Sequence, residues 1–173
     1  DDFDPLKAEP NVRLRYVISV SELGNPHAII IPGTKSTIAD LDWLRQSGLA
    51  DAITLFGTNG GTVVGICGGY QMLGNFILDP AHIESRLDQA AGLGLLTAQT
   101  NFLTEKATYQ AKAQIMHGYG WIEAVAGQWV EGYEIHMGET IVSGGNWLEV
   151  IERNHQPVHI LDGAASENGR IWG

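Results

Sequence analysis

The only cysteine of the chain, Cys67, lies between an apolar run and a helix-compatible run, Tyr70–Leu73. Glycines stand two residues before it and two residues after it, at positions 65 and 69. A sharp turn from a strand into a helix needs small residues there, because side chains at these positions would clash. The N–H groups and the dipole of a helix starting after Cys67 favour the thiolate over the thiol. We therefore predict that Cys67 is a nucleophile on a strand-to-helix turn.

Two donors for an oxyanion are predicted close to Cys67. Attack by a thiolate on a carbonyl carbon places negative charge on the carbonyl oxygen, and backbone N–H groups stabilise that charge. The N–H group of Gly68 is the first candidate. The segment Pro32-Gly33-Thr34, at the end of an earlier strand, offers the second.

Two other interpretations of these residues stay open at this point. Cys67 could be a small, buried apolar residue in a tight turn. The glycines could instead belong to a phosphate-binding loop, and the segment Gly33-Thr34-Lys35-Ser36 contains the Lys-Ser pair of such loops. That segment lacks the spaced first glycine of a Walker loop, which disfavours this use.

A nucleophilic cysteine needs a base that takes its proton and later protonates the leaving group. The tempting candidate is His136, in the segment Gly132-Tyr133-Glu134-Ile135-His136-Met137-Gly138-Glu139-Thr140. Surface or loop positions are predicted for the other five histidines, which are His27, His82, His117, His155 and His159. One cysteine and scattered histidines make no zinc ligand set, so we expect no metal in this domain.

The elements that position Cys67 follow from the apolar patterns of the first half. Strands are predicted over residues 12–18, 28–31 and 62–66. A capping box of Thr37 and Asp40 would begin a helix after the second strand, and another helix would follow Ser47-Gly48. This order of strands and helices is typical of a parallel sheet flanked by helices.

The second half of the chain has a different pattern, with short strand candidates separated in several places by glycine-containing turns. These candidates are residues 93–99, 107–116, 119–125, 129–135, 147–152 and 158–161. The last strand is expected at Arg170–Gly173. We therefore predict one α/β domain with a mostly parallel sheet and an antiparallel-rich second half.

Composition narrows the class of protein. The chain has 173 residues, 44% of them hydrophobic, which is enough for a packed core. Its formal net charge of −10 disfavours nucleic acid and anionic membranes as partners. No apolar run approaches the roughly 20 residues that span a bilayer, and a single cysteine excludes an intrachain disulfide. A cytoplasmic location is expected. Residues 1–11 are predicted to be a linker and residues 12–173 the domain, so we expect a fragment of a longer chain.

Four segments, in order, carry a family resemblance over nearly the whole chain. They are IIPGTKSTIADLDWLRQSGLADAI, GICGGYQMLGNFILDP, GLGLL followed by Thr97 and Thr100, and GYEIHMGET. The Cys67 segment resembles the nucleophile motif of class I glutamine amidotransferases. Together, the four segments are similar to the glutaminase domain of the cobyric acid synthase family. The resemblance implies a flavodoxin-like, doubly wound α/β fold of the class I glutamine amidotransferase type.

The resemblance also implies a reaction and partners. Cys67 would attack the side-chain amide of glutamine, release ammonia, and leave a thioester that water hydrolyses to glutamate. The ammonia would pass to a synthetase domain, fused upstream through residues 1–11, that uses ATP and Mg²⁺ to activate carboxylates of a bound cobalt corrinoid in cobalamin biosynthesis. No cofactor is implied for the glutaminase domain itself, and neither nucleic acid nor a membrane is implied as a partner.

Individual residues take roles from the same resemblance. Cys67 is the nucleophile, and Gly68 with Gly33 or Thr34 forms the oxyanion hole. Gln71, four residues after the nucleophile, helps to hold glutamine, and His136 lines the substrate site rather than serving as the base. The family places its catalytic histidine in a Tyr-x-His-Gly motif directly after the last strand. We therefore expect that histidine beyond residue 173, in which case the isolated chain would lack its base and could be inactive.

Two alternative functions remain. A glutaminase subunit that amidates a peptidoglycan lipid precursor carries a similar CGGYQ segment. A chain without its histidine could also be a non-catalytic module that binds glutamine or docks on a synthetase. The Leu41–Arg45 helix and the Glu134–Gly138 segment favour the cobyric acid synthase type over the lipid-modifying relative.

Overall fold

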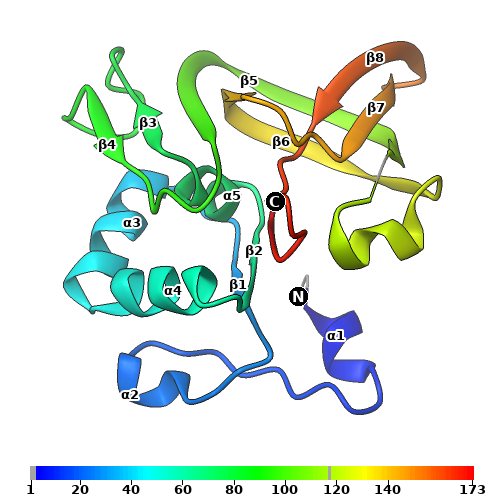
Figure 1. The fold of residues 1–173 in the computed structure, drawn as a ribbon. Helices are drawn as coiled ribbons and strands as arrows, with labels where there is room; N and C mark the ends of the chain where they lie inside the picture. The colour runs from blue at the N-terminus through cyan, green and yellow to red at the C-terminus, as the bar shows by residue number, and fades with distance from the viewer. Residues whose placement is uncertain (1–2, 117) are drawn as a thin grey trace.

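The computed structural model describes residues 3–116 and 118–173. The strands β1 (Ala28–Ile31) and β2 (Thr62–Gly65) of its first half form a three-stranded sheet with the C-terminal strand β9 (Ile171–Trp172), in the order β1-β2-β9. Both strand pairs are parallel. Parallel neighbours need a crossover between them, and the helices that follow β1 provide it (Figure 1).

Three helices pack on this sheet and bury its core. They are α3 (Thr37–Gln46), α4 (Leu49–Thr58) and α5 (Gly68–Leu73). Leu41 of α3, Leu73 of α5 and Val63 of β2 are completely buried. The helical faces predicted from the apolar spacing are present, since Ile38, Leu41, Leu44, Leu49 and Ile53 are all buried.

The capping box predicted at the start of α3 is wrong. Ser36, not Thr37, is the N-cap residue, and no side-chain cap bond is formed. The backbone N–H of Thr37 donates instead to Glu84 Oε2, 2.7 Å away. Asp40 accepts a hydrogen bond from the Thr34 hydroxyl, so its carboxylate binds the loop that precedes the helix.

The second half forms a six-stranded sheet with the path β4-β3-β5-β7-β8 and with β6 paired to β5. The pair β3–β5 is parallel, and the remaining pairs are antiparallel. The strands are β3 (Phe76–Leu78), β4 (Gln89–Ala91), β5 (Ala98–Ile115), β6 (Trp129–Val142), β7 (Leu148–Arg153) and β8 (Gln156–Asp162). The predicted fold class, a parallel α/β half followed by an antiparallel-rich half, is confirmed.

Two predicted strands do not form. Residues 12–18 run as irregular chain between α1 (Asp4–Ala8) and α2 (Val20–Leu23), because no neighbouring strand pairs with them. The Arg15 guanidinium binds the carbonyl oxygens of Glu22 and Leu23 instead. Residues 120–125 form the 3₁₀-helix η1 (Gly120–Val125) rather than a strand.

Within the predicted linker of residues 1–11, the helix α1 covers Asp4–Ala8. Of the predicted 93–99 strand, only residues 98 and 99 belong to β5. Among the described residues, no helix has the length and apolar character needed to cross a bilayer.

The C-terminal segment joins the two halves (Figure 1). Strand β9 pairs with β2, while the carbonyl oxygen of Gly173 accepts a hydrogen bond from Trp147 Nε1, 2.9 Å away. The indole rings of Trp147 and Trp172 meet edge to face, with 5.2 Å between their centroids. This contact brings the second sheet over the carboxyl end of the parallel strands, where ligands bind in folds of this kind.

Candidate active site

Cys67 lies at the turn between β2 and α5, in a backbone conformation with φ of 51° and ψ of −113°. Positive φ is uncommon for residues other than glycine and costs free energy that the surrounding structure must offset. A Cβ on Gly65 would lie 2.5 Å from Tyr70 Cα, and one on Gly69 would lie 2.1 Å from the carbonyl oxygen of Ile31. The two glycines are therefore required by close backbone approach, as the sequence predicted.

The thiol of Cys67 is exposed and reduced. This excludes the interpretation of Cys67 as a buried apolar residue. Its Sγ lies 3.6 Å from the carbonyl oxygen of Ile135 on β6, a distance at which the thiol donates a weak hydrogen bond. A residue 68 positions away in the sequence thus contacts the reactive atom.

The loop after β1 lies against the turn that carries Cys67. A Cβ placed on Gly33 would be 3.4 Å from Cys67 Cβ. A Cβ on Gly68 would be 2.6 Å from Thr34 Cγ2 and 3.3 Å from the Thr34 backbone nitrogen. The backbone of Gly33-Thr34 and that of Cys67-Gly68 therefore adjoin.

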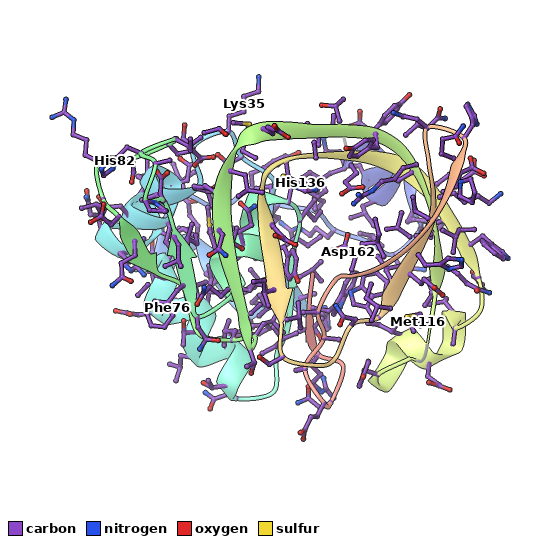
Figure 2. The ribbon with its side chains drawn as sticks, turned by 90° about the horizontal axis from the view of Figure 1, so that it is seen from above. Lys35, Phe76, His82, Met116, His136 and Asp162 are labelled. Carbon is purple, nitrogen blue, oxygen red and sulfur yellow. The ribbon has the colours of Figure 1, made fainter. Side chains whose placement is uncertain are left out.

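The phosphate-loop interpretation finds no support in this arrangement. Figure 2 shows Lys35 at the outer edge of the molecule, whereas His136 and Asp162 lie nearer its middle. Lys35 is exposed and does not line the cavity that contains Cys67. A phosphate-binding lysine would have to reach into that cavity.

The cavity at Cys67 has a volume of about 760 Å³ and is lined by both halves of the chain. The turn contributes Cys67, Tyr70 and Gln71, β6 contributes Glu134 and His136, and further lining residues include Asp162 and Trp147. Side chains that come from distant parts of the sequence therefore line one cavity. Its size is ample for a small amino acid.

Gln71 is buried, with 7% of its surface exposed, and lines the cavity one helical turn after Cys67. Its backbone N–H donates to the carbonyl oxygen of Cys67 across 3.0 Å. Its side-chain Oε1 lies 3.3 Å from the hydroxyl of Thr37, which donates to it. The predicted substrate-binding residue is thus placed beside the nucleophile and held from a second helix.

His136 also lines the cavity, but its ring is engaged with the protein. Its Nε2 lies 2.7 Å from Glu134 Oε1. Arg153 Nε donates to the other carboxylate oxygen across 2.7 Å. The hydrogen bond to Glu134 raises the pKa of His136, against an opposing effect of burial, and the backbone of Gly138 and the charge of Asp162 raise it further.

The Glu134 carboxylate is the centre of this group. Burial acts to raise its pKa, but the hydrogen bonds from His136 and Arg153 outweigh burial and hold the pKa of Glu134 below its usual value. From the sequence, Glu134 was expected only to line the site or to pack the end of a strand, and Arg153 was not predicted to be a site residue. The contact between Glu134 and His136 could have been predicted, because residues two apart on a strand share a face.

The remaining histidines that the structure describes lie outside the cavity, as predicted. His82, His155 and His159 each approach a carboxylate on the surface. His117 lies outside the described residues. Within the described part of the chain, no three or more His, Cys, Asp or Glu side chains gather into a group that could hold a metal ion.

The fold is that of glutamine amidotransferases. A solved structure titled as a glutamine amidotransferase superimposes with a TM-score of 0.56 at 15% identity, covering 90% of this chain and 72% of that one. The PurLQS structure from Thermotoga maritima superimposes with a TM-score of 0.63 at 16% identity, covering 92% of this chain and 72% of that one.

Residues 1–173 match the CobB/CobQ-like glutamine amidotransferase domain, and the chain belongs to this family. It is 45% identical to the cobyric acid synthase of Moorella thermoacetica over 173 residues, which is 99% of this chain and 34% of that protein. It is also 45% identical to the cobyric acid synthase of Salmonella arizonae, again over 99% of this chain and 34% of the relative. The chain thus spans about a third of the length of these relatives. The two alternative functions receive no support from these similarities.

Proposed function

We propose that this chain is the glutaminase domain of a cobyric acid synthase, with Cys67 as its nucleophile. One observation carries the proposal: Cys67 presents an exposed thiol on a strained turn at the edge of a cavity, with two backbone segments adjoining it. The similarity to cobyric acid synthases over 99% of the chain supports the choice of the family's reaction.

The mechanism follows from the position of the sulfur. The Cys67 thiol gives its proton to a base, and the sulfur attacks the side-chain carbonyl carbon of glutamine. As the C–S bond forms, an electron pair moves to the carbonyl oxygen, where the N–H groups of Gly68 and of Gly33 or Thr34 stabilise it. The C–N bond then breaks, and the nitrogen takes up a proton from the base and leaves as ammonia. Water hydrolyses the thioester and releases glutamate.

The contact with Ile135 describes the resting state of the thiol. A carbonyl oxygen 3.6 Å from Sγ accepts the S–H proton but would repel a thiolate. In the proposal, loss of the S–H proton ends this hydrogen bond with Ile135.

The base in this proposal is the catalytic histidine of the family pattern, and His136 is poorly suited to that role. Its Nε2 is occupied by Glu134, and the Gly138 backbone engages the ring as well. A base must have a ring nitrogen within reach of the proton that it takes.

The ammonia would be used by a second domain of the same protein. The relatives are about three times as long as the matched chain, which leaves room for an ATP-binding synthetase domain. In the proposal that domain uses ATP and Mg²⁺ to activate carboxylates of a cobalt corrinoid, a step of cobalamin biosynthesis. Both reactions, glutamine hydrolysis and amidation, would take place in the cytoplasm, and residues 1–11 would be the linker between the domains.

A comparison of the complete natural protein with its Cys67→Ala variant tests the assignment. We expect glutamate release to fall by at least about 1,000-fold in the variant, since a covalent step is lost. ATP-dependent amidation of the corrinoid supplied with an ammonium salt should persist, because free ammonia bypasses the thiol. Equal glutamate release by the two proteins would refute the role of Cys67. Failure of the ammonium-supplied amidation in both would refute the synthetase assignment.

A further inference from the structure

A loop of the second half reaches back to the helices beside the active site. It connects β3 to β4 and begins at Asp79, whose side chain is completely buried. The Asp79 carboxylate accepts hydrogen bonds from the backbone N–H groups of Ile83, Glu84 and Ser85, at 2.6, 3.0 and 2.8 Å. Three such bonds to one carboxylate fold the loop back on its own start and fix where residue 84 lies.

The loop places Glu84 at the beginning of α3. Glu84 Oε2 accepts the backbone N–H of Thr37 across 2.7 Å. This N–H is one of those left without a partner in the first turn of a helix, and a carboxylate is favoured there by the helix dipole. Thr37 is only 2% exposed, so both its backbone and its hydroxyl are held away from water.

The Thr37 hydroxyl in turn meets Gln71. The distance from Thr37 Oγ1 to Gln71 Oε1 is 3.3 Å, and the hydroxyl is the donor. A carboxamide has one acceptor end and one donor end of similar shape. With its acceptor end bound to Thr37, Gln71 retains its two Nε2–H donors for other acceptors, and the residue lines the cavity.

We propose that Thr37 and Glu84 are positioning residues of the glutamine site, acting through Gln71 by holding its side chain with the donor end toward the substrate. The proposal rests on the function proposed above and deepens it. Neither residue lines the cavity, so neither touches the substrate. Their effect is to select ligands that present an acceptor oxygen to Gln71, as the amide or carboxylate group of glutamine does.

The matched variants Thr37→Val and Thr37→Ser, made in the complete natural protein, test the contact. Valine has the shape of threonine without the hydroxyl, whereas serine keeps the hydroxyl. We expect Thr37→Val to raise KM for glutamine by about tenfold, since one buried hydrogen bond is lost. Thr37→Ser should stay within about threefold of the wild-type KM. Glu84→Ala against Glu84→Gln is a second pair, because glutamine retains an acceptor oxygen for the Thr37 N–H.

A double-mutant cycle separates positioning from a general loss of stability. In a Cys67→Ser background, which removes the chemistry, the Kd for glutamine is measured for Thr37→Val, Gln71→Ala and both together. Thr37→Val should weaken binding about tenfold when Gln71 is present and less than about twofold when it is absent. Equal effects in both backgrounds would overturn the proposal, as would a lowered thermal midpoint with unchanged Kd.

The outcomes distinguish this inference from the function on which it rests. A wild-type protein that releases glutamate, with additive effects of the two substitutions, overturns the positioning role alone. A wild-type protein that neither binds nor hydrolyses glutamine overturns the proposed function, and the positioning role with it.

Discussion

The position of the Cys67 sulfur depends on close contacts between the backbone of its glycine neighbours and that of adjacent segments. The strained conformation of Cys67 is held by backbone hydrogen bonds on both sides, from Ile66 N–H to the Ile31 carbonyl at 3.0 Å and from Gln71 N–H to the Cys67 carbonyl at 3.0 Å. These bonds tie the turn to β1 and to α5. The sulfur is therefore placed by the main chain rather than by side-chain packing, and an added methyl group in the turn should be costly.

A substitution at Gly69 tests this point. In Gly69→Ala the new Cβ would lie 2.1 Å from the Ile31 carbonyl oxygen, which cannot yield without moving β1. We expect the free energy of unfolding to fall by about 3 kcal/mol or more, in the range of severe overpacking. Urea unfolding provides the measurement. Gly132→Ala is the matched control, because nothing lies within 4 Å of a Cβ at that position; a similar loss in the control would contradict the explanation.

Among the elements, the loop between β3 and β4 depends on a single carboxylate. Burial acts to raise the pKa of Asp79, but the hydrogen bonds from Ile83, Glu84 and Ser85 outweigh it, so the pKa lies below the usual 3.8. A carboxyl with a lowered folded pKa adds stability above its unfolded pKa, and this stability is lost as pH falls through the folded pKa. The stability that Asp79 adds to the loop should therefore be fully present at neutral pH and decrease only below about pH 4.

The variant Asp79→Asn should expose this dependence. At pH 7 we expect the free energy of unfolding to fall by about 2–4 kcal/mol, because three N–H groups lose an ionised acceptor. The difference between wild type and variant should shrink as the pH is lowered below about 3.8, where the wild-type carboxyl also loses its charge. Urea unfolding across this pH range gives the curve. Asp88→Asn, on the exposed part of the same loop, is the control and should change stability by less than about 0.5 kcal/mol.

Across the whole molecule, the two sheets are joined at the C-terminal segment. Strand β9 belongs to the parallel sheet, whereas Ala165, shortly before it, donates its backbone N–H to the carbonyl oxygen of Gly145 in the connection between β6 and β7. Gly173 exchanges backbone hydrogen bonds with Ala164 at 3.0 Å in both directions and accepts the Trp147 indole N–H. The cavity at Cys67 lies between the two halves, so its shape depends on this junction.

Trp147 offers a graded test of the junction. Trp147→Phe keeps an aromatic ring but loses the hydrogen bond to Gly173, and should cost about 1 kcal/mol. Trp147→Ala also loses the ring contact with Trp172 and should cost about 3–5 kcal/mol. Hydrogen exchange of the peptide covering residues 164–173 should accelerate in the same order. Trp129→Ala, at a side chain that is 53% exposed, should leave that exchange unchanged; equal acceleration would show that the junction does not depend on Trp147.

Several features of the chain could be predicted from local sequence because their causes are local. The glycines around Cys67, the apolar faces of α3 and α4, and the change from parallel to antiparallel strands follow from short-range patterns. The strand predicted at residues 12–18 failed because a strand also needs a neighbour, and local alternation does not supply one. The capping box at Thr37 failed because the carboxylate of Glu84, 47 residues away, accepts the backbone N–H of Thr37. In the predicted capping box, Asp40 would have accepted that N–H.

The sequence by itself determined the reactive turn and the family, since both reside in contiguous motifs whose spacing reflects backbone sterics. Tertiary structure alone decided the surroundings of that turn. The Ile135 carbonyl reaches the sulfur, Glu134 binds both His136 and Arg153, and Glu84 reaches Gln71 through Thr37. Most of these contacts join residues far apart in the chain. A hydrogen bond forms only where the donor–acceptor distance is correct to within a few tenths of an ångström, and only the packed sheets and helices establish such distances.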